Sequence, residues 1–373
     1  MGAEQVDAIV IGAGLAGSAT AWALTRRGRS VVVLEAFGPG HRRGSSHGSA
    51  RIFRRAYPDP LYVRLTGEAE RLWRQLADET GEELVLRTGG LDYGPVREAE
   101  KMYDILRAHG VTAELMAAEA AAERWPGVVF GSEPVLFHPD AGVVDPERAM
   151  AAMRRLAVAA GAKIIYETAV VRVSDTPGGA VVETVDASWR APVAIVAAGP
   201  WLDPLLGGLV RLPELAVTQQ QAFHFAPVTP AWNGAPPPPV FVRYGETVTY
   251  GLLAGRDGEV PGAIKIAEHG PAKVTTGDGR DGIVDPAVRD RIRAFVRDEL
   301  TGLDPSPVGE LTCLYTSTPS EDFILDRQGP FVICSACSGH GAKFAPLTGE
   351  IAAGLACGGA SPEQRFTLAA HLR

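Results

Sequence analysis

The sequence predicts an α/β protein in which a doubly wound parallel sheet carries an inserted, mixed and largely antiparallel second domain. The first observation is a strand–helix–strand pattern at the N-terminus, and the second is a series of alternating, strand-like segments in the middle of the chain. The third is the length of 373 residues, which exceeds what one hydrophobic core usually supports. Two structural units are therefore expected.

The N-terminal pattern spans about thirty residues. Residues 6–11, VDAIVI, are a short apolar run typical of a buried parallel strand. Residues 14–28, GLAGSATAWALTRRG, predict a helix with two arginines in its last turn and a glycine stop. Residues 30–36, SVVVLEA, predict the second strand, so the order implies a right-handed parallel crossover.

The rest of the chain alternates between helical and strand-like segments. Four consecutive prolines make residues 230–241 an expected surface loop, because proline cannot donate to a sheet. Helices are expected at 60–80, 97–109 and 146–160, and strands at 162–173, 180–187, 191–202, 216–227, 240–253 and 262–270. These segments predict a doubly wound domain made of residues 1–85, 150–215 and 310–373 and an inserted domain made of 86–149 and 216–309.

Composition narrows the class of protein. Apolar residues make up 46% of the chain, which is ample for a globular core, and the net charge of −8 argues against a nucleic-acid binder. Four cysteines in a chain of this length favour a reducing compartment over a disulfide framework. The apolar N-terminus contains Asp7 and spaced glycines, unlike a signal peptide or a membrane span, so we expect a cytoplasmic protein with no membrane partner.

The glycines at positions 12, 14 and 17 form the pattern G-x-G-x-x-G between the first strand and the first helix. In this context Gly12 permits a tight turn, Gly14 permits close approach of a pyrophosphate, and Gly17 permits helix–strand packing. The helix N-terminus offers amide donors to phosphates. Glu35, about twenty residues on, can accept from ribose hydroxyls and would repel a 2′-phosphate. A dinucleotide site is predicted, with NAD and FAD both open.

Residues 44–57, GSSHGSARIFRRAY, place Arg51, Arg54 and Arg55 on a Gly/Ser-rich stretch. Taken alone, the segment fits a solvated basic loop as well as a clamp for phosphate or carboxylate, which guanidinium forks match. Together with CLYTSTPSEDFILD (313–326) and CSGHGAKF (337–344), it resembles the monomeric sarcosine oxidase and N-methyltryptophan oxidase family of D-amino-acid-oxidase-like flavoproteins. The resemblance covers nearly the whole chain.

The resemblance implies FAD in the N-terminal site, held covalently through a thioether to Cys313. By itself, a lone cysteine between threonine and leucine is more often an inert core thiol. The glycine-rich segment 337–344 is expected to run close to the flavin ring. Further residues expected at the cofactor are Ser46, His47, Val170, Gly199, Trp201, Gly339, Gly341 and Lys343.

Family positions also imply roles at the substrate. Arg51 and Lys265 match residues placed against the flavin, and Arg54 and Lys343 match the pair that grips the substrate carboxylate. His269, Tyr315 and Tyr250 match residues that line the substrate cavity. From the residues alone, Lys265 also fits the outward position of an edge strand, and His269 fits a polar turn.

The implied reaction is oxidation of a secondary or tertiary amino acid, such as an N-methyl amino acid, to an imine, with O₂ reduced to hydrogen peroxide by a monomeric enzyme. Glu268 departs from the family, where an aromatic residue precedes the histidine, so a changed cavity wall and a different substrate are expected alternatives. The other hypotheses are an oxidase of a cyclic imino acid, a flavin dehydrogenase with another acceptor, and a non-catalytic FAD-binding subunit. Cys334 and Cys337 form one C-x-x-C pair without the partners of a metal site.

Overall fold

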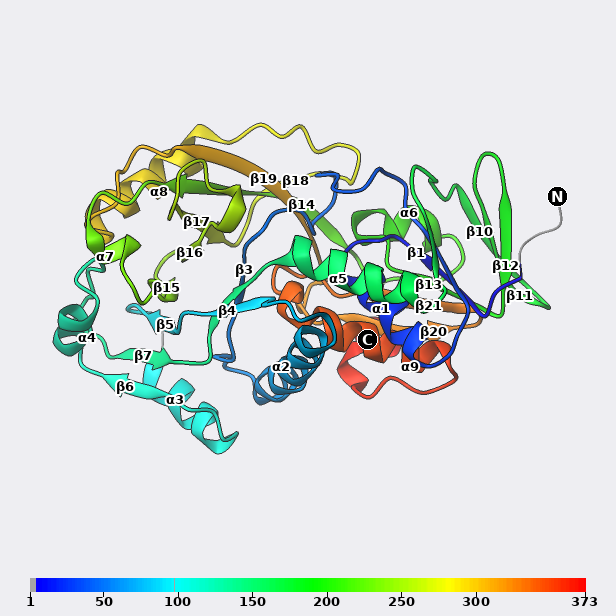
Figure 1. Cartoon of the computed structure of the whole chain (residues 1–373), viewed down its shortest axis with the longest axis horizontal. Helices are drawn as coiled ribbons and strands as arrows, with labels where there is room; N and C mark the ends of the chain where they lie inside the picture. Colours follow the sequence, from blue (N-terminus) through cyan, green and yellow to red (C-terminus); the bar gives the residue numbers. More distant parts are fainter. Residues whose placement is uncertain (1–4, 97) are drawn as a thin grey trace.

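A computed structural model describes residues 5–96 and 98–373. One half of the molecule is built on a six-stranded sheet in the order β20-β21-β13-β1-β2-β9 (Figure 1). Its neighbours pair in parallel except β20 and β21, which are antiparallel. The strands are β1 (Ala8–Ile11), β2 (Val31–Leu34), β9 (Lys163–Ile165), β13 (Val193–Val196), β20 (Ile324–Gln328) and β21 (Phe331–Ser335).

Helices cover this sheet because its central strands are apolar on both faces. α1 (Leu15–Arg26) packs between α5 (Pro146–Ala159) and α9 (Ala345–Ala356), and α2 (Pro60–Thr80) lies beside α9. The α1–α9 contact is close: a Cβ on Gly349 would lie 2.4 Å from the carbonyl carbon of Ala19. The helix predicted at 60–80 is confirmed with the same first and last residues, and the helix predicted at 146–160 ends one residue earlier, at Ala159.

The other half is built on a nine-stranded sheet in the order β18-β14-β17-β16-β15-β5-β7-β6, with β19 on the other edge of β14. It is antiparallel except where β5 pairs with β15, as the alternating pattern predicts. Its strands are β5 (Gly90–Tyr93), β6 (Glu114–Met116), β7 (Val135–His138), β14 (Ala216–Phe225), β15 (Val240–Tyr244), β16 (Val248–Leu253), β17 (Ile264–His269), β18 (Lys273–Val274) and β19 (Gly309–Ser317).

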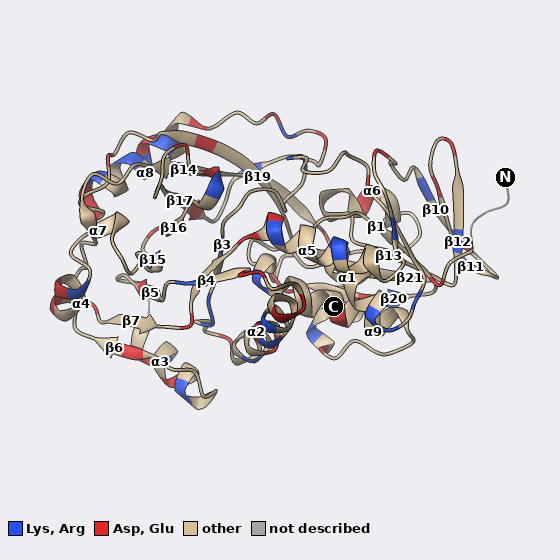
Figure 2. Cartoon of the chain, in the orientation of Figure 1, with Lys and Arg blue, Asp and Glu red and all other residues tan. Residues whose placement is uncertain are grey.

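Four helices belong to this half or to its connections: α3 (Ala99–Ala108), α4 (Ala118–Arg124), α7 (Pro230–Asn233) and α8 (Pro286–Glu299). α8 buries Ile292 and Val296 in the same apolar cluster as Phe223 and Ile266 of the sheet. Arginines and acidic residues both occur along α2, α4 and α8 (Figure 2). Within residues 5–96 and 98–373, no helix is long and apolar enough to cross a membrane.

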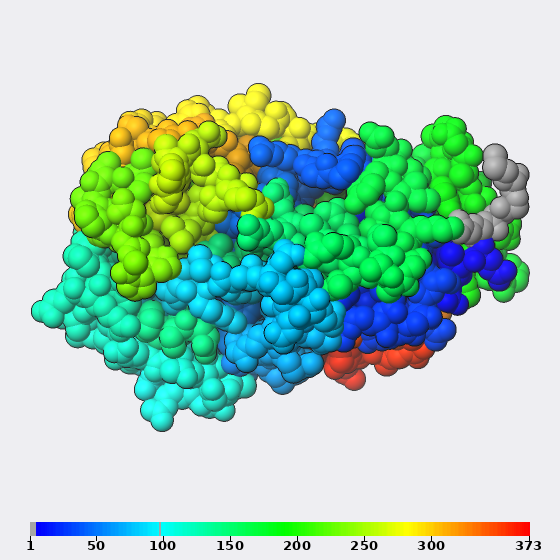
Figure 3. All heavy atoms as spheres, viewed as in Figure 1, coloured from blue at the N-terminus to red at the C-terminus, as the bar shows by residue number. Residues whose placement is uncertain are grey.

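A small antiparallel sheet connects the two halves. In it β8 (Gly142–Val144) lies between β3 (Arg51–Phe53) and β4 (Val85–Arg87). A second three-stranded sheet, β10 (Arg172–Thr176), β11 (Gly179–Glu183) and β12 (Ser188–Ala191), flanks the parallel sheet. α6 (Leu202–Leu206) and α10 (Leu368–His371) complete the set of helices named here. On the face shown in Figure 3, residues of α2 and α5 cover the middle of the molecule.

Four local predictions differ from the structure. The strand expected at 240–253 is the two antiparallel strands β15 and β16. The strand expected at 162–173 is two strands, because Glu167 has a φ of 54° and the chain turns around the end of β2. There the amide of Thr168 donates to the carbonyl of Glu35 at 2.8 Å. The expected loop 230–241 begins with the helical turn α7, which buries Trp232 against the antiparallel half. The helix expected at 97–109 covers 99–108, and residue 97 lies outside the described residues.

β19 crosses the expected boundary at residue 310. It pairs with β14 along its length, from Ala216 opposite Ser317 to His224 opposite Gly309. The strand therefore extends the antiparallel sheet, while β20 and β21, which follow it, belong to the parallel sheet. This crossing brings residues of β19 to the contact between the two halves, where the candidate site lies.

Candidate active site

A single cavity of about 1370 Å³ extends from the turn after β1 to the antiparallel sheet. That volume exceeds the roughly 300–1,000 Å³ of an ordinary small-molecule pocket, so it suits a dinucleotide together with a substrate. Every residue expected at the cofactor or the substrate lines this cavity except Gly17, which lies behind the turn. The fold thus brings together residues that are up to 331 positions apart, from Gly12 to Lys343.

The turn after β1 requires its glycines. Gly12 has a φ of +96°, and a Cβ on it would lie 2.6 Å from the carbonyl oxygen of Ala197. A Cβ on Gly17 would lie 1.8 Å from the carbonyl oxygen of Gly12. Gly14 precedes the first turn of α1, where Ser46 Oγ accepts from the amide of Leu15 at 3.1 Å. The turn therefore presents bare backbone to the cavity, as a pyrophosphate site needs.

Glu35 follows β2 at the same end of the cavity. Its carboxylate accepts from the amides of Ala13 at 2.7 Å and Phe37 at 3.1 Å, and His41 Nε2 lies 3.4 Å away. Burial raises the pKa of Glu35, but the bonds from His41, Ala13 and Phe37 outweigh it and the net shift is downward. Glu35 is thus a charged acceptor that also holds the glycine turn against β2.

His47 supplies a polar atom that needs a partner. Its Nε2 is buried and has no hydrogen-bond partner among the described residues. Burial lowers its pKa to about 3, with further contributions from Arg51, Arg280 and Lys265, so the ring is neutral. A bound group with a hydrogen-bonding atom at this wall would satisfy that nitrogen. The glycine turn and this unpaired nitrogen of His47 together suit a site that binds FAD.

At the same end, Trp201 and its neighbours form an aromatic wall. Trp201 follows β13 in the turn η1 (Gly199–Trp201), and its ring centroid lies 5.4 Å from that of Phe37. The indole Nε1 donates to Asp278 at 2.9 Å, which anchors a loop of the other half over the cavity. Val170, in the segment between β9 and β10, also lines this end.

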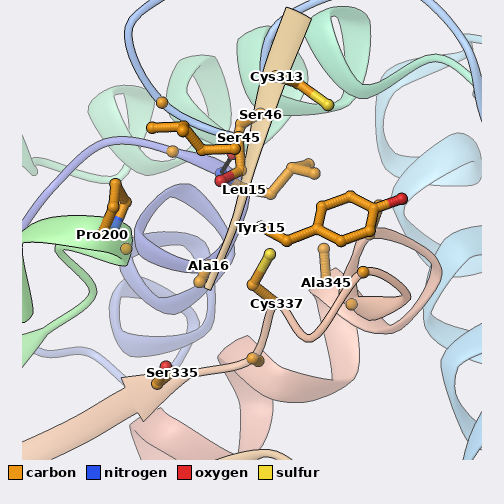
Figure 4. A pocket seen from close by; sticks show the side chains of 18 of the residues that line it. Leu15, Ala16, Ser45, Ser46, Pro200, Cys313, Tyr315, Ser335, Cys337 and Ala345 are labelled. Atoms are coloured by element: carbon orange, nitrogen blue, oxygen red, sulfur yellow. Dashed lines mark hydrogen bonds between the residues drawn. The ribbon is translucent and has the colours of Figure 1, made fainter. Parts of the chain in front are cut away.

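Cys313 and Tyr315 project from the same side of β19, with Cys337 close to Tyr315 (Figure 4). Two-residue spacing on a strand places both side chains on the cavity face. Burial, and then the neighbouring Cys313, raise the pKa of Tyr250 to about 12. Both phenols therefore keep their protons, and Cys337 Sγ accepts from the amide of Thr316 at 3.5 Å.

Arg51 and Lys265 approach the cavity from two different sheets. Arg51 donates to the carbonyls of Ser45, His47 and Ala50 at 3.1, 2.8 and 2.8 Å, which fixes the loop that ends in β3. Lys265 on β17 is 4% exposed, and its Nζ lies 3.5 Å from the carbonyl of Ala50. Burial, and then Arg51, lower the pKa of Lys265 to about 7. The alternative that Lys265 points outward from an edge strand is therefore wrong, because Lys265 is buried and β17 lies between β14 and β16.

Lys343 lies in the turn η3 (Gly341–Phe344) and is 6% exposed. Its Nζ donates to Tyr57 Oη at 3.0 Å and to the carbonyl of His340 at 2.8 Å. His340 Nε2 faces the carbonyl of Glu321 at 3.1 Å, so this nitrogen carries the proton and Nδ1 accepts from Tyr57 at 3.1 Å. Burial, and then Arg54, lower the pKa of Lys343 well below its usual value.

Close contacts within the protein explain why positions 339 and 341 of segment 337–344 are glycines. Gly339 has a φ of +71°, and a Cβ on it would lie 2.6 Å from the Tyr315 ring and 2.7 Å from the His269 ring. A Cβ on Gly341 would lie 1.6 Å from the carbonyl oxygen of Ala336. The segment therefore folds tightly against the rings of the cavity wall, and this tight fold carries Lys343 into the cavity.

Arg54 follows β3 and is already paired. It donates to Asp92 at 3.0 Å and to the carbonyl of Ala56, and its guanidinium lies 5.1 Å from the centroid of the Tyr57 ring. Burial acts to lower the pKa of Arg54, but Tyr244 and Asp92 outweigh it, so the net shift is upward and the group stays charged. Asp92 is a residue that sequence reasoning missed.

Glu268 does not form part of the cavity wall. Its carboxylate binds Arg291 of α8 through two hydrogen bonds of 2.9 and 2.7 Å, on the face of β17 opposite to that of Lys265 and His269. The pKa of His269 is lowered chiefly by burial, whereas the carboxylate that opposes this shift belongs to Glu321. The expectation that Glu268 alters the histidine or the cavity wall is therefore wrong.

Tyr57, His340 and Glu321 are further cavity residues that sequence reasoning missed. Each lies within a segment that the resemblance had already marked, but nothing in the local pattern indicates that Tyr57 and His340 would bond across 283 positions. Glu321 has a φ of 61°, which is uncommon for a residue with a side chain. In the part of the chain that the structure describes, no group of three or more acidic, histidine or cysteine residues could hold a metal.

The parallel sheet, the bare glycine turn and the cavity between two halves define a dinucleotide-dependent oxidoreductase. Residues 7–355 match the FAD dependent oxidoreductase family, and the chain belongs to that family. It is 31% identical to the monomeric sarcosine oxidase of Bacillus sp. (strain B-0618), over 95% of this chain and 92% of the relative. It is 30% identical to the N-methyl-L-tryptophan oxidase of Salmonella agona, over 95% of each chain.

Among solved structures, the open form of NikD, an unusual amino acid oxidase essential for nikkomycin biosynthesis, has a TM-score of 0.84 at 26% identity. The likeness covers 97% of this chain and 96% of NikD. These findings confirm the predicted fold class, the FAD requirement and the resemblance to the sarcosine and N-methyltryptophan oxidases.

Proposed function

We propose that this protein oxidises a secondary or tertiary amino acid of the N-methyl type to an imine, with O₂ reduced to hydrogen peroxide. The observation that carries the proposal is a pair of basic side chains, buried Lys343 and half-buried Arg54, in the same cavity as the glycine turn. Relatives at 30–31% identity carry the names monomeric sarcosine oxidase and N-methyl-L-tryptophan oxidase. A carboxylate-bearing amine is the substrate class that suits such cations.

When bound, FAD would supply the acceptor for a hydride equivalent, and the turn at 12–17, Glu35, His47 and the wall at Trp201 would hold it. The protein itself contributes position and charge. Lys343 and Arg54 would bind the substrate carboxylate and so fix the amine and its C–H bond in the cavity. Tyr57 would keep the Lys343 ammonium aimed at that carboxylate.

The substrate amine must lose its ammonium proton before it can be oxidised. His269 lies with Tyr315 at the cavity wall, with ring centroids 5.8 Å apart. Because burial lowers the pKa of His269, a neutral imidazole is available to accept a hydrogen bond or a proton from the amine. The same dry surroundings favour the neutral amine over the ammonium ion.

The proposal is tested by a screen for hydrogen peroxide release by the purified holoenzyme. N-methyl amino acids, cyclic imino acids and N-methylalkylamines without a carboxylate should be compared at equal concentration. We expect release from at least one N-methyl amino acid and little from the alkylamines. Preference for a cyclic imino acid would assign the enzyme to that substrate class instead. Reduction of the enzyme by substrate without release of peroxide would indicate a dehydrogenase.

We also propose that the flavin is bound covalently through Cys313. The thiol is partly buried, lines the cavity and shares a face of β19 with Tyr315. Acid-precipitated wild-type protein should be yellow and heavier by one FAD, and Cys313→Ala should lose both properties. Cys337→Ala is the matched control, since Cys337 lines the same cavity and should leave the attachment unchanged. Free flavin in the supernatant of denatured wild-type protein would contradict the assignment.

Two further properties are proposed on sequence grounds. Four cysteines in a chain of 373 residues favour a reducing compartment and so a cytoplasmic enzyme, and the resemblance favours a monomer. Light scattering of the purified holoenzyme over a range of concentrations would test the second point: a mass that stays at one chain supports it, and a mass of two chains contradicts it.

A further inference from the structure

Asp92 is a buried carboxylate directly behind the proposed substrate clamp. It lies on β5, is 0% exposed, and does not line the cavity itself. Its Oδ1 accepts from Arg54 at 3.0 Å and from Tyr244 Oη at 3.1 Å, and its Oδ2 lies 3.2 Å from His138 Nε2. Burying a carboxylate is costly unless it is paired and hydrogen-bonded; here Arg54 forms the ion pair, and Tyr244 and His138 add hydrogen bonds.

The sheet places these partners on neighbouring strands. β15 lies beside β5 with Val242 opposite Asp92, and β7 lies on the other side with His138 opposite Gly90. His138 Nδ1 is buried without a partner among the described residues, so the tautomer that fits has its proton on Nε2 and donates to Asp92. Asp92 is therefore the only negative charge of this four-residue group, and it faces Arg54.

Asp92 changes the net charge near a substrate bound in the cavity. Arg54 and Lys343 would present two positive charges, but the guanidinium of Arg54 forms an ion pair with Asp92. The hydrogen-bond acceptors of Lys343 given above, Tyr57 Oη and the carbonyl of His340, carry no charge. Glu321 also lines the cavity and adds a further negative charge. The positive charges of Arg54 and Lys343 are therefore largely offset by Asp92 and Glu321, while both basic groups keep their hydrogen-bond donors.

We infer that Asp92 is a specificity-determining residue that makes the substrate clamp select a single carboxylate over a dicarboxylate. The inference deepens the proposed function and rests on it. By offsetting the charge of Arg54, Asp92 lowers the net positive charge at the clamp by one, while the guanidinium keeps its donors. Without Asp92 the clamp would carry one more positive charge, and dianions such as N-methylaspartate would gain more than monoanions.

The test is the Asp92→Asn variant of the holoenzyme, with acetate and malonate as probes at constant ionic strength. Their dissociation constants are measured by calorimetry, which needs no turnover. In the wild type, malonate should bind no more than about tenfold tighter than acetate. In Asp92→Asn, the preference for malonate should rise by at least about tenfold, as expected for one unscreened unit charge in a partly dry cavity.

Two controls separate charge from geometry. His138→Asn removes a donor to Asp92 but leaves the Asp92–Arg54 charge pair, so the malonate preference should stay as in the wild type. Glu268→Gln neutralises a carboxylate that is likewise bound to an arginine but faces away from the cavity. It should also leave the preference unchanged. A shift in either control as large as that in Asp92→Asn would overturn the inference.

Other outcomes are equally informative. If Asp92→Asn weakens the binding of acetate and of malonate by the same factor, Asp92 only positions Arg54. The inference that Asp92 selects substrates by charge would then be wrong. If the variant does not fold, the wild type still decides: malonate binding a hundredfold tighter than acetate would refute a clamp whose positive charge is offset by Asp92. Anion selectivity that moves as expected in a protein that oxidises no amino acid would uphold the inference while rejecting the proposed function.

In turnover, the same variant should raise kcat/KM for N-methyl-L-aspartate relative to sarcosine. An unchanged ratio, together with an unchanged malonate preference, would remove Asp92 from any role in specificity.

Discussion

Replacing Lys265 by methionine is expected to slow the reaction of the reduced enzyme with oxygen by at least about a hundredfold, the scale of one removed electrostatic stabiliser. Lys265 is buried beside Arg51, and an ammonium there would stabilise negative charge that develops on oxygen. Methionine keeps the length and the apolar stem, so the fold should survive. Anaerobic reduction by the substrate should change little, because no negative charge develops on the neutral amine.

The pH dependence follows from the lowered pKa of Lys265. Burial and Arg51 lower it to about 7, so the ammonium is present below this pH and is lost as the pH rises through it. Because the charged form is the one that helps, wild-type reoxidation should slow between about pH 6 and 8. In Lys265→Met that dependence should be absent.

Stopped-flow measurement of the two half-reactions checks both expectations. Lys273→Met is a matched control, since Lys273 lies on β18 of the same sheet, is exposed and pairs with Asp281. It should leave both rates unchanged. Collapse of substrate reduction in Lys265→Met with fast reoxidation would show that Lys265 serves the substrate and not oxygen.

Replacing Lys343 by methionine is expected to reduce kcat/KM for the amino-acid substrate by about 2–5 kcal/mol of transition-state binding, the cost of removing one partner of a buried charge pair. The ammonium is held between Tyr57 Oη and the carbonyl of His340, so methionine would remove the charged donor from this position. The backbone is anchored independently, because Trp73 Nε1 donates to the carbonyl of Lys343 at 2.7 Å.

Steady-state kinetics with an amino acid and with the amine that lacks its carboxylate give the decisive comparison. The wild type should strongly prefer the amino acid, and Lys343→Met should lose most of that preference. Lys101→Met, on the exposed face of α3, should behave as the wild type does. Equal turnover of the two substrates by the wild type would rule out a carboxylate clamp.

The fold could be predicted where a local pattern has one structural solution. The G-x-G-x-x-G turn is such a case, because Gly12 and Gly17 leave no space for a side chain in a β-α-β unit. The helix at 60–80 is another, with Asp59 as a cap and Gly81 as a left-handed stop. The strand at 162–173 was wrong because only the neighbouring end of β2 makes the chain turn at Glu167.

For the site, the sequence by itself determined which residue types were available, and the resemblance determined which of them to consider. Lys265, Lys343 and Arg54 could be named in this way. Their partners could not, because hydrogen bonds such as Tyr57–His340 and Arg54–Asp92 join segments whose separation in the chain carries no information about their distance in space.

Glu268 and Asp92 illustrate the same limit from opposite sides. Glu268 lies on a predicted strand and Asp92 in a segment for which no element was predicted, and neither local pattern shows which charges will surround the carboxylate. The packing of α8 gives Glu268 an arginine outside the cavity, whereas the pairing of β5 with β15 and β7 places Asp92 behind Arg54. The tertiary structure alone decided which carboxylate lies against Arg54, and the effect of a buried charge depends on which charges lie within a few ångströms of it.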